Sequence, residues 1–164
     1  AVGPGGRVLG IDLTGPLLEL ARERVAGYDT VAVVRGDATT PPTDDADAVL
    51  ATFVCGLFTD PAAVVDRWCD IVGPGGRIGL LDATASERPP GRLLNPAFRA
   101  FVAAGSPKCG AADILRAPFD DIDSELSARA DAARRALADR TIERRYETFG
   151  LGFVGLLTGT VANE

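Results

Sequence analysis

The stretch Arg7–Thr14 has the sequence RVLGIDLT, a short apolar run that ends in a carboxylate and precedes a helix start. A nearly continuous apolar run bounded by turn residues predicts a strand buried on both faces, as in a parallel sheet. An acidic residue at the carboxyl end of such a strand points into the crevice where open α/β sheets bind ligands. Asp12 can there accept hydrogen bonds from both hydroxyls of a ribose. The alternative is that it only caps the following helix.

The composition indicates one soluble domain. The chain has 164 residues, of which 46% are hydrophobic, yet no apolar run reaches the ~20 residues that a membrane-spanning helix needs. Because no charged-then-apolar signal peptide opens the chain, we expect a cytoplasmic protein. The formal net charge of −6 disfavours non-specific binding to nucleic acid or to an anionic membrane.

The chain has no histidine, which excludes Ser-His-Asp and Cys-His nucleophilic schemes and His-ligated metal sites. The three cysteines, Cys55, Cys69 and Cys109, are widely spaced and form neither a disulfide framework nor a CxxC pair. We therefore expect them to be small apolar core residues, and we expect no metal site.

Strand and helix patterns alternate over the first half of the chain. Apolar runs at 31–34, 46–52 and 78–81 predict three further buried strands. Helix starts at Thr14 and Asp60 each precede apolar residues at helical spacing. Strands that alternate with helices of about 10 to 15 residues predict βαβ units and a doubly wound, mostly parallel sheet, an α/β fold.

A glycine-rich turn occurs twice. Val2–Arg7 has the sequence VGPGGR, and the same six residues recur at Val72–Arg77 before an apolar run that ends at Asp82. The first copy cannot be a phosphate-binding loop, because such a loop follows a strand and opens a helix. The two copies predict repeated helix-to-strand connections in one sheet.

The alternation stops after Asp82. Residues 83–140 combine loop-forming proline, glycine and asparagine with two helical segments, and we expect them to cap the substrate site. Residues 141–164 predict an antiparallel β-hairpin at the edge of the sheet. We expect 1–164 to form a single domain.

Aromatic residues gather within the cap segment. A short helix predicted to begin at Asn95 carries Phe98 and Phe101 on one side, and together with Phe119 these rings can line an apolar pocket. The simpler interpretation, which base rates favour, is that the aromatic rings pack the helix onto the sheet.

The groups that follow the first two strands form a candidate nucleoside site. A parallel sheet brings the carboxyl ends of its strands to one rim, so these groups can meet on one ligand. We expect Asp12 to bind the ribose hydroxyls and Leu13 to pack on one face of a purine. Asp37 can accept from an exocyclic amine, while the Ala38 amide donates to a ring nitrogen.

The third strand ends with Thr52 and Phe53, which we expect to lie along whatever group the nucleoside carries. No residue can be assigned a catalytic role from the sequence. Asp82 and Tyr146 are available proton acceptors, but no pattern singles out either of them.

Five motifs follow one another in an order and spacing that are more specific than any one of them. They are the strand 8–13 with its acidic end, the turn 36–38 (GDA), the strand entry 47–49 (DAV), the turn 73–76 (GPGG) and the hairpin end 156–159 (LLTG). In these motifs the sequence resembles the class I S-adenosylmethionine-dependent methyltransferases, specifically the small-molecule type related to quinone-biosynthesis enzymes.

This resemblance implies a Rossmann-like fold, S-adenosyl-L-methionine as cofactor and methyl transfer to a small-molecule acceptor. In that family a central first strand and a glycine-rich loop hold the methionine end of the cofactor. The resemblance places both before Ala1, so we expect them to be missing from these 164 residues. The acceptor and the oligomeric state are not predicted.

Two alternatives remain open. The first is a non-catalytic binding domain, including a truncated and inactive methyltransferase. The second is an NAD(P)-dependent oxidoreductase on a related fold. Its short-chain type needs a Tyr-x-x-x-Lys pair, and the single lysine, Lys108, has no tyrosine four residues before it.

Overall fold

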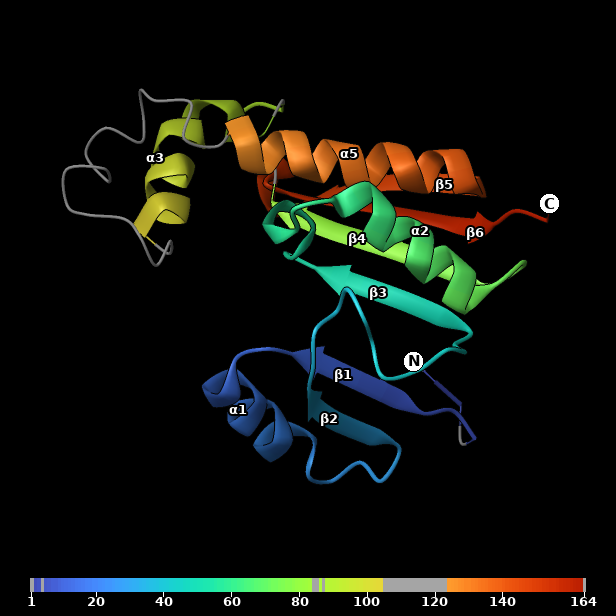
Figure 1. The fold of residues 1–164 in the computed structure, drawn as a ribbon. Helices are drawn as coiled ribbons and strands as arrows, with labels where there is room; N and C mark the ends of the chain where they lie inside the picture. The colour runs from blue at the N-terminus through green and yellow to red at the C-terminus, as the bar shows by residue number, and fades with distance from the viewer. Residues whose placement is uncertain (1, 4, 84–85, 87, 105–123, 164) are drawn as a thin grey trace. The chain divides into compact units, whose positions relative to one another are not determined.

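The computed structural model describes residues 2–3, 5–83, 86, 88–104 and 124–163, and the chain divides into two compact units. Unit 1 is Ala1–Asp44 and unit 2 is Asp45–Glu164. Figure 1 shows the elements of both units in chain order. No helix in the described ranges is long and apolar enough to cross a membrane.

Unit 1 is a βαβ unit. Its two strands are parallel, and Asp12 at the end of the first strand lies opposite Arg35 at the end of the second. Thr14 occupies the N-cap position of the helix, as predicted, although its side chain makes no capping hydrogen bond. The elements are β1 (Val8–Asp12), α1 (Gly15–Val25) and β2 (Val31–Arg35).

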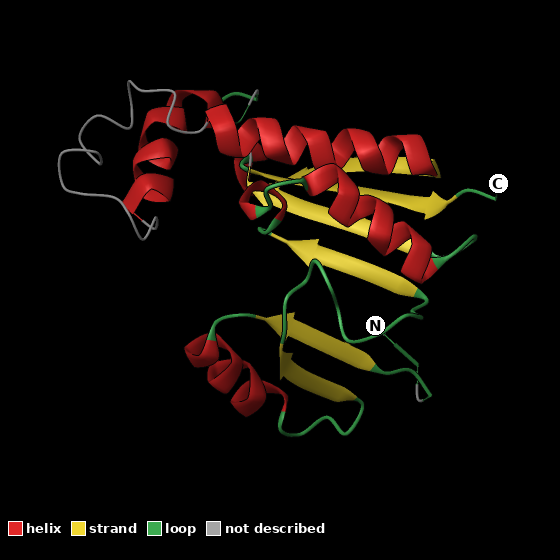
Figure 2. Cartoon of the chain, in the orientation of Figure 1, coloured by secondary structure: helices red, strands yellow, loops and turns green. Residues whose placement is uncertain are grey.

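Unit 2 is a four-stranded sheet in the order β3-β4-β6-β5, with helices α2 and α5 over one face (Figures 1 and 2). β3 and β4 are parallel, whereas β6 is antiparallel to both β4 and β5. The elements are β3 (Ala48–Thr52), η1 (Cys55–Leu57), α2 (Pro61–Val72), β4 (Arg77–Ala83), α3 (Gly91–Ala104), α5 (Ser124–Arg140), β5 (Thr141–Phe149), η2 (Gly150–Gly152) and β6 (Val154–Val161).

The predicted α/β fold, with parallel βαβ connections and a C-terminal hairpin, is confirmed. The strands of the described residues form two sheets, in which β1 pairs with β2 alone and β3 pairs with β4 on one side alone. Each of these two strands therefore has an edge that carries no ladder of hydrogen bonds. The family's first strand, expected before Ala1, stays a prediction.

Helix α2 begins and ends where its sequence predicts. Asp60 is its N-cap, and the carboxylate Oδ1 accepts a hydrogen bond from the Ala63 backbone N at 3.1 Å. Gly73 ends the helix with φ of 68°, a conformation that glycine adopts without steric cost, and its N donates to Cys69 O. The second glycine-rich turn is thus a helix-to-strand connection, as expected.

The core of unit 2 lies between the sheet and the helices that cover it. Trp68 on α2 and Leu137 on α5 are buried, as are Ile78 and Leu80 on β4. Two of the three cysteines contribute to this core, as predicted: Cys55 and Cys69 are fully buried. The third, Cys109, lies outside the described residues.

The prediction that a helix begins at Asn95 is wrong, because α3 begins at Gly91 and contains Pro96 in its interior. The Asn95 side chain does not cap a helix. Its Oδ1 accepts from the Ser86 N at 2.9 Å, and its Nδ2 donates to the Ser86 O at 3.1 Å. These two hydrogen bonds connect α3 to the loop that follows β4. The spacing of residues in the sequence does not predict such a pairing, because it forms only in the folded chain.

Phe98 on α3 stacks on Phe153, with ring centroids 4.5 Å apart. This contact supports the interpretation that Phe98 packs its helix against the hairpin rather than lining a pocket. Phe119 and the side chain of Phe101 lie outside the described residues, so their predicted place in an acceptor pocket stays a prediction.

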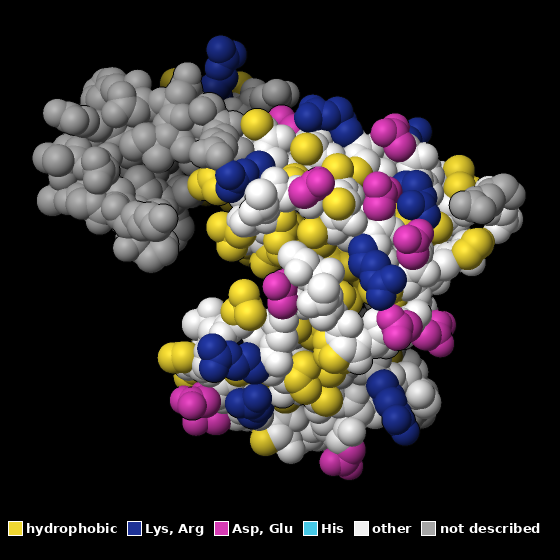
Figure 3. Space-filling view, viewed as in Figure 1, with side chains coloured by type: hydrophobic (Ala, Val, Ile, Leu, Met, Phe, Trp, Pro, Cys, Tyr) yellow, Lys and Arg dark blue, Asp and Glu magenta, His cyan; other side chains and the backbone are white. Residues whose placement is uncertain are grey.

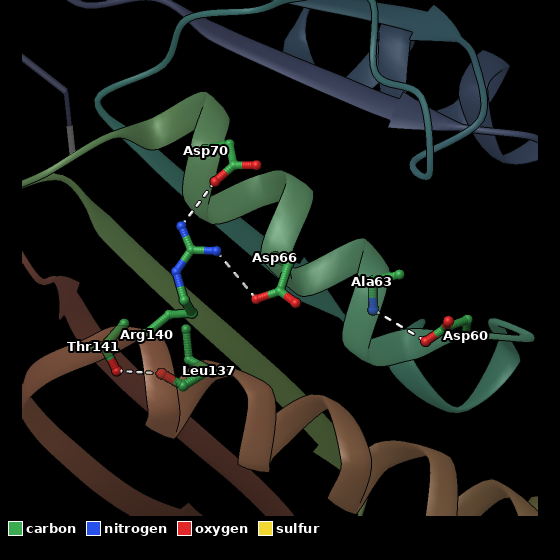
Figure 4. A network of polar contacts seen from close by, with 7 residues as sticks. All are labelled: Asp60, Ala63, Asp66, Asp70, Leu137, Arg140 and Thr141. Atoms are coloured by element: carbon green, nitrogen blue, oxygen red, sulfur yellow. Dashed lines mark hydrogen bonds and ion pairs between the residues drawn. The ribbon is translucent and has the colours of Figure 1, made fainter. Parts of the chain in front are cut away.

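Arg140, the last residue of α5, joins that helix to α2 (Figure 4). Its Nη1 donates to Asp66 Oδ1 at 3.3 Å and its Nη2 donates to Asp70 Oδ1 at 2.8 Å. The hydrogen bond to Asp70 raises the pKa of Arg140. Both carboxylates are at least half exposed, so water screens the two ion pairs.

We expect the apolar contact, not these ion pairs, to hold α5 on α2. Leu137→Ala should lower the free energy of unfolding by about 2–5 kcal/mol, because it leaves a cavity under a fully buried side chain. Arg140→Met should lower it by less than about 1 kcal/mol. Urea unfolding followed by the fluorescence of the single tryptophan, Trp68, measures both. A larger loss for Arg140→Met would contradict this order.

Candidate functional site

In unit 1 the two candidate carboxylates lie at the carboxyl ends of neighbouring parallel strands. Asp12 is the last residue of β1, and its backbone O accepts from the Gly36 N at 3.1 Å. Asp37 follows Gly36 directly, so the pairing of β1 with β2 brings the two carboxylate-bearing turns together. The sequence predicted this meeting of strand ends from the parallel arrangement.

Asp12 is half-buried, and one of its oxygens already has a partner. The Oδ1 atom accepts a hydrogen bond from the Thr14 backbone N at 2.6 Å, which supports the turn into α1. This is a local contact of the kind that the capping interpretation predicted. The Oδ2 atom makes no hydrogen bond to another described residue, so it is the oxygen that can bind a ligand hydroxyl.

The other candidate residues of unit 1 differ in solvent exposure. Asp37 is exposed, and its Oδ1 accepts from the Thr39 N at 2.8 Å. Hydrogen bonds from Thr39 lower the pKa of Asp37, so this carboxylate is charged at neutral pH. Leu13, directly after β1, is 60% exposed and offers an apolar surface beside Asp12. Ala38 is half-buried.

In unit 2 the candidates Thr52 and Phe53 lie at the carboxyl end of β3. Thr52 is paired with Leu81 on β4, and the Phe53 N donates to the Leu81 O at 2.7 Å. Both candidate side chains are exposed. They lie where a parallel sheet presents its strand ends to a ligand.

Phe53 has an unusual backbone conformation. Its φ is 56°, in the left-handed region, which costs a bulky residue about 1–2 kcal/mol. The sequence pattern gave no sign of this strain, because a phenylalanine after a strand normally continues with negative φ. Strained residues of this kind gather at functional sites, where surrounding contacts hold them. Phe53 is therefore the strongest geometric signal in the unit 2 part of the candidate site.

Asp82 is a further carboxylate at this rim of unit 2, one residue beyond Leu81. It is only 4% exposed, and burial raises its pKa, while the charge of Arg134 and hydrogen bonds from Cys55 oppose the shift. In turn, burial and the Asp82 charge raise the pKa of the Cys55 thiol to about 12. Cys55 is therefore a neutral thiol at physiological pH and not a nucleophile.

Charges of both signs are interspersed over the visible faces of the two units, and they are not gathered into one basic patch there (Figure 3). In the part of the chain that the structure describes, no group of three or more cysteine, aspartate or glutamate side chains could hold a metal ion.

Comparisons with known proteins show a similarity to methyltransferases. Residues 1–80 match the family described as "Methyltransferase domain". This match covers just under half of the chain. The chain is 41% identical over 83 residues to the nocamycin O-methyltransferase of Saccharothrix syringae, a match that covers 48% of this chain and 30% of that protein. It is 32% identical over 105 residues to the demethylmenaquinone methyltransferase of Clavibacter sepedonicus, covering 63% of this chain and 42% of that protein.

The fold agrees with this assignment. The N-methyltransferase NodS from Bradyrhizobium japonicum WM9, solved in complex with S-adenosyl-L-homocysteine, superimposes with a TM-score of 0.56 over 96% of this chain and 67% of that chain. The sequence identity is 13%, so this likeness concerns the fold alone. The predicted resemblance and the Rossmann-like methyltransferase fold are confirmed, and the matches span less than half the length of the two curated relatives.

We expect glycine at position 53 to give a higher free energy of unfolding than alanine. At ordinary positions alanine gives a higher free energy of unfolding than glycine by about 0.4–1 kcal/mol, because glycine is more flexible in the unfolded chain. With φ of 56° that order should reverse, so Phe53→Gly should be more stable than Phe53→Ala by about 1 kcal/mol. Urea unfolding of the two variants measures the difference, and greater stability of Phe53→Ala would show that the left-handed conformation is absent in solution.

Proposed function

We propose that the methyltransferase domain binds S-adenosyl-L-methionine at the carboxyl ends of its parallel strands and transfers the methyl group to a small-molecule acceptor. The observation that carries this proposal is the meeting of Asp12 and Asp37 at the ends of β1 and β2, in a segment that matches the family. The names of the relatives favour methyl transfer over the oxidoreductase alternative.

The residues of unit 1 fit the nucleoside part of this cofactor. Asp12 Oδ2 has no partner among the described residues and would accept from a ribose hydroxyl. Leu13 would pack its exposed side chain on the purine. Asp37, held as a carboxylate, would accept from the exocyclic amine, and the Ala38 amide would donate to a ring nitrogen.

In unit 2 the candidate cofactor residues are Thr52 and Phe53. They would lie along the part of the cofactor beyond the ribose, with the strained Phe53 backbone holding its ring at the end of β3. When bound, the cofactor supplies an electrophilic methyl group on a sulfonium. The residues of the chain then have mainly to hold an acceptor in line with that methyl group, and such placement accounts for much of the rate acceleration in reactions of this kind.

The acceptor is proposed only as a small molecule. One relative is named for O-methylation of nocamycin and another for methylation of demethylmenaquinone, so their names do not agree on one acceptor.

We expect Asp12 to be the most sensitive cofactor residue. Asp12→Asn keeps an oxygen for the Thr14 N but replaces the ligand-binding Oδ2 with an amide group that cannot accept. A lost hydrogen bond to a charged group should cost about 1.5–3 kcal/mol, a ten- to hundredfold loss in affinity. Asp37→Asn should do less harm, because its amide oxygen can still accept from an amine. Titration calorimetry with S-adenosyl-L-homocysteine measures both.

Asp29→Ala is the matched control, because Asp29 is exposed and lies before the amino end of β2, away from the strand ends. Its affinity for S-adenosyl-L-homocysteine should equal that of the unaltered chain. Unchanged affinity in a folded Asp12→Asn variant would overturn the ribose assignment. Equal losses for Asp12→Asn and Asp37→Asn would mean that the adenine contact is misplaced.

A further inference from the structure

Helix α3 is attached to unit 2 in a different way from α2 and α5. In Figure 1, α2 and α5 lie over one face of the sheet, whereas α3 follows β4 and lies beyond the end of the sheet. Among residues 91–98, the part of α3 whose burial the structure describes, Gly91 alone is buried. Leu93 is 82% exposed and Leu94 is 46% exposed. This part of the helix therefore gains little stability from hydrophobic burial.

A buried serine fixes the beginning of α3. Ser86 is 2% exposed, and its Oγ donates to the Leu151 O of η2 at 2.6 Å, while its backbone makes the two hydrogen bonds with Asn95. A Cβ atom at Gly91 or Gly152 would lie 2.5 or 2.6 Å from the Ser86 Oγ, so the backbones approach too closely for a larger residue. We call these five residues the Ser86 junction. It joins α3 to the turn between β5 and β6.

A second attachment lies further along α3. The ring of Phe98 stacks on that of Phe153, with centroids 4.5 Å apart and an angle of 27° between the ring planes. Both residues are only half-buried, in contrast to Ser86. An aromatic pair that water partly reaches is the weaker of the two attachments, because it is a single contact without hydrogen bonds.

Pro96 weakens the helix between the two attachments. It lies in the interior of α3, and its ring nitrogen has no hydrogen to donate to the Arg92 O, so one backbone hydrogen bond of the helix is missing there. Helices bend most easily at such positions. A change in the direction of α3 is therefore easiest at Pro96, just beyond the Ser86 junction.

We propose that α3 is a hinged cap, in which the Ser86 junction is the fixed end and the Phe98–Phe153 stack is the contact that opens. Local opening occurs where a segment buries few apolar groups, as α3 does. Both attachments lie at the carboxyl ends of β4 and β5, where η2 follows β5. Admission of the methyl acceptor is the use that we assign to this opening. That use rests on the proposed function, whereas the opening itself does not.

Amide hydrogen exchange, followed by NMR on the 164-residue chain without ligand, tests the hinge. We expect the amides of residues 97–104 to exchange at least about tenfold faster than those of 65–72 in α2, whose side chains build the core. The Ser86 amide, which donates to Asn95, should exchange more slowly than the amides of 97–104. Equal protection of α3 and α2 would overturn the proposal.

Two variants test the attachments separately. Phe98→Ala should speed exchange in 97–104 by about two- to tenfold, the ratio expected for the loss of an aromatic pair, and should leave the Ser86 amide unchanged. Ser86→Ala should speed exchange both in α3 and in residues 150–153, because the Oγ bond to Leu151 is lost. Leu93→Ala is the matched control, since it truncates an exposed side chain of the same helix and should change exchange by less than about twofold.

Unchanged exchange in Phe98→Ala would overturn the stack as the contact that opens. Equal acceleration of the Ser86 amide and of 97–104 in that variant would overturn the fixed end. Phe98→Ala decides both points even if Ser86→Ala does not fold, which Trp68 fluorescence reports. A separate titration with S-adenosyl-L-homocysteine tests the proposed function, and its failure beside the expected exchange would remove the acceptor role and leave the hinged cap.

Discussion

The parallel pairing of β1 with β2 and of β3 with β4 determines where every candidate side chain lies. Within each pair the strands run in one direction, so their carboxyl ends fall at one edge of that sheet, and the residues that follow them must turn there. The pair Asp12–Arg35 places Asp12 and Asp37 together, and the pair Thr52–Leu81 places Phe53 beside Asp82. A shift of either register by one residue would turn these side chains to the opposite face.

The two units differ in how well they bury their apolar residues. Unit 2 has a core built by α2, α5 and β4, and Trp68, Leu80 and Leu137 lie inside it. In the described residues of unit 1, Leu18 is the one buried hydrophobic side chain, and Leu17 and Leu20 are more than half exposed. A parallel pair with so little cover gains little from hydrophobic burial.

Local patterns allowed much of the fold to be predicted. The apolar runs located all four parallel strands, and the Asp60 cap and Gly73 located both ends of α2. The meeting of Asp12 with Asp37 followed from the parallel arrangement alone. These features depend on neighbours in sequence or on the geometry common to every parallel sheet, so a single sequence contains the information.

Contacts between distant residues could not be predicted in this way. Asn95 pairs with Ser86 instead of capping a helix, and the left-handed Phe53 donates its N–H to the O of Leu81, which is distant in sequence. No sequence pattern singled out Asp82, because its burial arises only in the folded chain. Side chains that matter for chemistry are often of this kind, since their surroundings come from several elements at once.

The most direct test of the central claim is an amide NMR titration of the chain with S-adenosyl-L-homocysteine. We expect the largest shift changes at the strand ends, in residues 12–14, 36–39 and 52–55, and small changes in residues at the amino ends of the same strands, near 8, 31, 48 and 77. Shift changes confined to the amino ends, or no change at saturating ligand concentration, would contradict a cofactor site at the carboxyl ends of these strands.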